Sequence, residues 1–110
     1  WCLNAVTQPD GVAEAVLIRA VEPLEGIHLM IQSRRTDVFR NLCSGPGKLT
    51  KAFRIDRKHN GSDLVTGHLR IVEGQRIRNL VQTTRIGISQ GVELPLRFYS
   101  AEHLKWVSKR

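Results

Sequence analysis

A chain of 110 residues, 41% hydrophobic and 25% charged, can bury one modest core, and this composition excludes a disordered tail. Seventeen Lys and Arg against ten Asp and Glu give a net charge of +7, a bias typical of proteins that bind a polyanion. Residues 31–58 hold eight basic residues against two acidic ones, whereas residues 1–30 hold one against four. Such a basic block is either a solvated face or a phosphate-binding surface.

Cysteine and histidine usage bounds the chemistry further. Cys2 and Cys43 are too few for a disulfide framework, and we identify no signal peptide or apolar run of membrane length. The four histidines are scattered, without Cys or acidic partners at the spacing of metal ligands. We therefore expect a reducing compartment, no membrane association and no metal.

The first six residues alternate in the manner of a strand, and there is no initiating Met. We expect that the chain begins inside an element and that further residues precede it; a short strand that opens the domain is the alternative. Gln8–Gly11 then has the residues of a turn, because Pro presets φ and Gly accepts positive φ.

Ala15–Ile18 is a continuous apolar run suited to a strand buried on both faces. Arg19 interrupts the run before Ala20 and Val21 resume it. Since an unpaired buried guanidinium is very costly, Arg19 either extends past the strand to water or meets an anion or a carboxylate.

Pro23 and Gly26 break this strand, and Ile27, Met30 and Ile31 then recur at helical spacing. The pattern predicts a short helix whose C-terminal end carries Arg34 and Arg35. Favourable interaction of these cations with the helix dipole would explain them without any ligand.

Ser44–Lys48 has the residues of a helix start, and the expected helix has an apolar stripe of Leu49, Ala52 and Phe53. A helix N-terminus with Lys48 beside it is suited to a phosphate, although a solvated lysine at a plain helix start is the alternative. The segment is no nucleotide P-loop, because the Walker spacing is absent and Leu49 follows the lysine.

The C-terminal half is expected to be mostly strand. Alternation predicts antiparallel strands at 69–73 and 77–80 around a Gly74 turn, a strand at 84–89 and an edge-like strand at 94–99. Trp106 and Val107 are expected to pack this end against the rest of the chain.

Taken in this order, five segments resemble the alkyladenine DNA glycosylase family, which removes 3-methyladenine and related bases from DNA. They are residues 15–26, 43–49, 85–88, 95–99 and 106–108. The resemblance implies an α+β fold: a single mixed domain with a curved, largely antiparallel β-sheet and a few short helices. Residues 1–110 would be the C-terminal portion of one such domain.

The resemblance also implies a base-excision repair activity. A member of this family flips an alkylated purine out of the duplex, and water hydrolyses the N-glycosidic bond without any cofactor. The expected partner is double-stranded DNA that contains alkylated bases, and the expected state is a monomer. The location would be the cytoplasm or nucleoid of a bacterium, or the nucleus of a eukaryote.

Five positions match functional residues of that family. Arg19 stands where an arginine helps to hold the flipped nucleotide's phosphate and the attacking water, and Ile86 stands where a backbone carbonyl orients that water. Asn4 matches an asparagine beside the base that disfavours guanine, and Arg34 and Lys48 match DNA phosphate contacts.

The resemblance is incomplete at the catalytic carboxylate. In that family the glutamate that activates water, the residues that stack on the base and the tyrosine wedge all precede the position of Trp1. We therefore expect the 110-residue chain alone to be inactive. A non-catalytic nucleic-acid-binding module that keeps only the scaffold is the alternative function.

Overall fold

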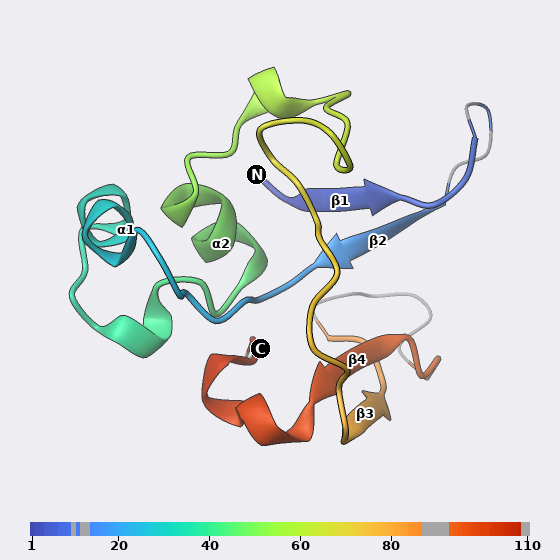
Figure 1. Ribbon diagram of the computed structural model, residues 1–110. Helices are drawn as coiled ribbons and strands as arrows, with labels where there is room; N and C mark the ends of the chain where they lie inside the picture. Colours follow the sequence, from blue (N-terminus) through green and yellow to red (C-terminus); the bar gives the residue numbers. More distant parts are fainter. Residues whose placement is uncertain (10, 12–13, 87–92, 109–110) are drawn as a thin grey trace.

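The computed structural model describes residues 1–9, 11, 14–86 and 93–108 of the chain (Figure 1). Helices and strands both occur, which confirms the α+β class. The strands are β1 (Leu3–Val6), β2 (Ala15–Ile18), β3 (Leu80–Thr83) and β4 (Arg97–Ser100), the α-helices are α1 (Ile27–Arg34) and α2 (Pro46–Ala52), and the 3-10 helices are η1 (Phe39–Asn41), η2 (Arg57–His59) and η3 (Ala101–Trp106).

The strands form two separate antiparallel pairs. β1 pairs with β2, Leu3 opposite Ile18, and β3 pairs with β4, Leu80 opposite Ser100. Figure 1 shows the first pair beside the helices and the second pair below them, next to η3. The expected single curved sheet is therefore not observed among the described residues, where each ladder stops after four residues on either strand.

The first pair is partly buried, and the pattern of burial differs between its two strands. Leu3 and Ala5 of β1 are partly covered and alternate with the exposed Asn4 and Val6, as strand geometry requires. Burial of the whole of β2 on both faces was expected and is wrong: Ala15 and Val16 are exposed, and only Leu17 and Ile18, which point to opposite faces, are partly buried. In the connecting segment, Asp10 lies outside the described residues.

Both predicted helices are present, and they form the core together. The spacing of Ile27, Met30 and Ile31 turns one face of α1 toward α2, where Leu49 and Ala52 are buried. Phe53, expected in the same stripe, lies beyond the end of α2 and is partly exposed. The buried core consists of Met30, Leu42, Cys43, Leu49, Ala52 and Ile55, with Leu3, Ile18, Val21 and Leu69 packed against it.

The C-terminal half differs most from expectation. The hairpin predicted from strands at 69–73 and 77–80 around Gly74 is not formed: residues 69–79 lie outside any strand, and only Leu80 belongs to one, as the first residue of β3. The apolar side chains of Ile71, Val72 and Ile77 are exposed, so no packing partner stabilises a strand there. Residues 84–86 are not in a strand either, and 87–89 lie outside the described residues. Trp106 packs as predicted: it is buried, with its ring edge-on to Phe39 at a centroid distance of 5.2 Å.

Candidate functional site

A cavity of about 650 Å³ lies where β4, η3 and residues 40–48 meet. Four basic side chains line it, namely Arg40, Lys48, Arg97 and Lys105. None of the described residues that line it is acidic or a histidine. The cavity therefore has the positive potential of an anion-binding site, and its lining offers no carboxylate or imidazole that could take a proton from water.

Lys48 reaches the cavity from the first turn of α2. The helix begins at Pro46, whose fixed φ suits the first helical position and whose missing N–H leaves no unpaired donor there. Lys48 is exposed, whereas Leu49 and Thr50, which follow it, are buried. Burial of one face of α2 in the core thus directs this lysine outward, as the sequence predicted.

Arg97 and Tyr99 reach the cavity from one face of β4, because they are two residues apart on a strand. The Cζ atom of Arg97 lies 4.9 Å from the centre of the Tyr99 ring, a cation–π arrangement. Nη2 of Arg97 also donates a hydrogen bond of 2.8 Å to the carbonyl oxygen of Ser108. The guanidinium is therefore fixed in position at the cavity wall.

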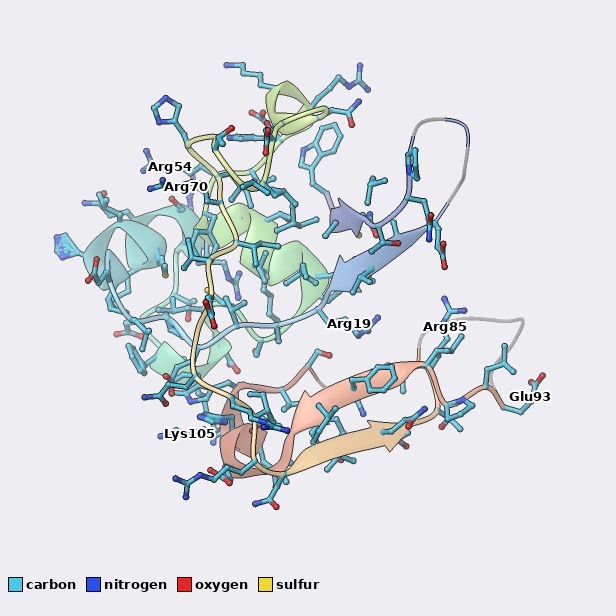
Figure 2. All side chains as sticks on the ribbon, turned by 45° about the vertical axis from the view of Figure 1, so that its right-hand side comes forward. Arg19, Arg54, Arg70, Arg85, Glu93 and Lys105 are labelled. Carbon is cyan, nitrogen blue, oxygen red and sulfur yellow. The ribbon has the colours of Figure 1, made fainter. Side chains whose placement is uncertain are left out.

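Arg19 is half-buried immediately after β2 and makes contact with the same wall. Its Nε donates to Oγ of Ser108 at 3.3 Å, and Ser108 lines the cavity together with Ile86. Figure 2 shows Arg19 in the space between β2 and β4. The structure thus brings the Arg19 side chain to the wall where Ile86 lies, while the catalytic roles of both residues stay predictions.

The other two predicted positions lie elsewhere. Asn4 is exposed on β1 opposite Leu17, and it is not among the residues that line the cavity. Arg34 donates from Nε to the Leu42 carbonyl and from Nη2 to the Asn41 carbonyl, both at 3.0 Å. Since Asn41 lines the cavity, Arg34 holds the backbone of the wall in place through these bonds. Contacts of Asn4 with a base and of Arg34 with DNA stay predictions.

Two groups outside the cavity have altered proton affinity. Burial raises the pKa of the Cys43 thiol, an effect that the positive charge of Arg34 partly offsets. Backbone N–H groups of Val65 and Thr66 hold the pKa of Asp63 below its usual value. Neither group lines the cavity, so both shifts concern the scaffold.

The described part of the chain contains no group of three or more His, Cys, Asp or Glu residues that could hold a metal ion. No helix in it combines the length and apolar character needed to cross a membrane.

Comparison with known families gives a match along nearly the whole chain. The model of the methylpurine-DNA glycosylase family matches residues 1–104. The chain belongs to this family. The resemblance deduced from the five sequence segments is thereby confirmed.

Curated relatives are similar to this chain over nearly all of its length. The proteins from Prosthecochloris aestuarii, Carboxydothermus hydrogenoformans and Methanoculleus marisnigri are 49%, 48% and 45% identical over 97%, 100% and 99% of this chain. All three are named as candidate 3-methyladenine DNA glycosylases. The chain spans only 52% to 59% of the length of these relatives.

Sequence reasoning missed most of the cavity. Arg40 and Lys105 were counted only in the charge, and Arg97 and Ser108 were noted only within matching segments. One signal could have identified Arg97: in Leu-Arg-Phe-Tyr, Arg97 and Tyr99 must share one face of a strand. No signal of this kind exists for Ser108, which comes to the wall through a contact with a residue 89 positions away.

Proposed function

We propose that this chain is the C-terminal portion of a base-excision DNA glycosylase that removes alkylated purines of the 3-methyladenine type. Membership of the methylpurine-DNA glycosylase family supports this proposal. The observation that carries it is the basic cavity, which combines Lys48 with Ile86 and with the Ser108 contact of Arg19. A wall of this charge is suited to the DNA backbone beside an extruded nucleotide.

In the proposed reaction the damaged nucleotide leaves the base stack, and water attacks its deoxyribose carbon. The N-glycosidic bond breaks, the base leaves, and an abasic site remains in an intact strand. Arg19 holds the phosphate of the flipped nucleotide and the water, the Ile86 carbonyl orients the water, and Asn4 lies beside the base. A carboxylate that activates the water is expected from outside residues 1–110.

The partner in this proposal is double-stranded DNA with alkylated bases, bound by a monomer in the compartment that holds the DNA. Arg34 and Lys48 contribute phosphate contacts. No resident cofactor takes part in the proposed reaction, since water is the only co-reactant that glycosidic hydrolysis requires.

The test is a base-release assay on a duplex that carries one alkylated purine. The product of the complete reading frame and the 110-residue chain are incubated with it, and abasic sites are converted to strand breaks by alkali. We expect breaks with the complete product and few or none with the chain alone. If the complete product binds the damaged duplex and yet releases no base, the glycosylase proposal is wrong and a non-catalytic DNA-binding module takes its place.

A further inference from the structure

Ser108 joins two arginines that are far apart in the sequence. Its side chain is almost fully buried, at 3% exposure, and its Oγ accepts a hydrogen bond of 3.3 Å from Nε of Arg19. Its carbonyl oxygen accepts one of 2.8 Å from Nη2 of Arg97. Two guanidinium groups are therefore held within the span of one residue.

No carboxylate among the described residues compensates these two charges. The one contact of salt-bridge type found in that part of the chain joins His59 to Asp56, and neither residue lines the cavity. Like charges brought together at a partly buried wall repel each other, and an anion between them would remove the repulsion. Ser108 itself is neutral and offers only dipoles.

The donors of both arginines suit a phosphate. A guanidinium carries five N–H groups in a planar fork, of which the contact with Ser108 takes one from each arginine. Tyr99 lies against the guanidinium of Arg97, which limits the rotation of that fork. Since side-chain freedom is already restricted before binding, less entropy is lost when an anion is bound.

We propose that Arg19 and Arg97 form a clamp for one phosphodiester group of DNA and that Ser108 is the positioning residue for both. The clamp rests on the proposed function, from which DNA is taken as the ligand. DNA is favoured over a single small anion because the cavity continues from Arg97 to three further basic side chains, Arg40, Lys48 and Lys105. Such a row is suited to successive phosphates along a backbone.

The experiment measures binding rather than catalysis, so that it is independent of base release. The complete product is titrated by fluorescence anisotropy into a short duplex with one central tetrahydrofuran abasic-site analogue, which fixes the register. Arg19→Gln and Arg97→Gln are each expected to weaken binding about tenfold, the loss typical of a hydrogen bond to a charged group. Arg70→Gln is the control, because it removes the same charge from an exposed position on the side of Arg54 (Figure 2). It is expected to change the affinity for the duplex less than about twofold, since a distant exposed charge is screened by salt.

A second series identifies the phosphate. Each phosphate near the abasic analogue is replaced in turn by a neutral methylphosphonate. We expect a single replacement to abolish the effects of both Arg19→Gln and Arg97→Gln. Effects that disappear at two different phosphates, or an Arg97→Gln loss no larger than that of Arg70→Gln, would overturn the clamp.

Two further variants separate positioning from folding. Arg97→Lys keeps a charged group that can donate to the Ser108 carbonyl but loses the planar fork of the guanidinium. Its affinity for the duplex is therefore expected to lie between that of the native protein and that of Arg97→Gln. Ser108→Ala is expected to weaken binding to the duplex with the native phosphate but not to the duplex with the methylphosphonate at that position. The thermal melting curve of the variant protein should match that of the native protein. If Ser108→Ala weakens binding to both duplexes equally, Ser108 does not position the clamp. Base release that fails while this pattern holds would contradict the proposed function alone.

Discussion

Lys48 is the predicted DNA contact whose environment in the structure is simplest. Its side chain is exposed at the cavity, and no hydrogen bond or ion pair to it is found among the described residues. Lys51 lies one turn further along α2, is also exposed and is not among the residues that line the cavity. The two lysines are therefore a matched pair on one helix.

We predict that Lys48→Ala weakens duplex binding and reduces the salt slope, that is, the change of log K with log salt, by about 0.9, one phosphate's worth of released counterion. Lys51→Ala is expected to leave the slope nearly unchanged. Anisotropy titrations between low and physiological salt measure both. Equal changes in the two variants would show that Lys48 acts only through the overall charge.

At the scale of single residues, the sequence alone could predict side chains that belong to one element. Lys48 was placed by the helix start before it, and Arg19 by its interruption of an apolar strand. The contact between Arg19 and Ser108 could not be predicted, because it depends on how two distant segments pack. Arg34 was predicted on the helix end, but its use of the Asn41 and Leu42 carbonyls depends on the path of the next loop.

α1 is followed by a residue, Arg35, whose backbone adopts a conformation that is rare for residues other than glycine. Arg35 caps the helix with φ of 56° and ψ of 40°, the left-handed region, where its Cβ crowds the backbone. Its N–H donates to the Ile31 carbonyl at 2.8 Å, so the conformation serves the cap.

We predict that Arg35→Gly raises the free energy of unfolding by about 0.5–1 kcal/mol, because glycine adopts this conformation without strain and the gain exceeds its extra freedom in the unfolded chain. Urea unfolding followed by circular dichroism measures the change. Arg35→Ala keeps the strain and is the control, expected to give no such gain. A loss of stability in the glycine variant would mean that the arginine side chain contributes more than the strain costs.

At the scale of elements, helices were predictable and most strands of the C-terminal half were not. In α1 and α2 the spacing of the apolar residues along the local sequence is enough to identify the side of each helix that is buried. Alternation in residues 69–80 gave a strand pattern with no buried face, because a strand is stabilised by a partner that the local sequence does not reveal.

At the scale of the whole molecule, the two thiols differ in whether a reagent can reach them in the folded protein. Cys2 is exposed, whereas Cys43 is 1% exposed within the core between α1 and α2. Burial raises the pKa of Cys43, so folding favours its protonated form. The stability that this group contributes is therefore complete below its ordinary pKa of about 8.5 and is lost as the pH rises further.

We predict that the thiol of Cys2 reacts rapidly with a disulfide reagent at neutral pH and that the thiol of Cys43 reacts only as fast as the protein unfolds. The free energy of unfolding should fall as the pH rises above the ordinary pKa of a cysteine thiol, and should fall less in Cys43→Ala. Reagent kinetics and urea curves at several pH values measure these effects. Rapid reaction of two thiols in the native protein would show that the core opens far more readily than its packing implies.

The wall of the cavity is assembled from residues that are very distant along the chain. The Arg19 to Ser108 contact spans 89 positions, and ordering a loop of that length costs about 4 kcal/mol of chain entropy. Contacts of such range slow folding more than they lower stability. The nearby helices α1 and α2 can therefore pair early, whereas the cavity wall is expected to come together late and to limit how fast a newly made chain acquires the cavity.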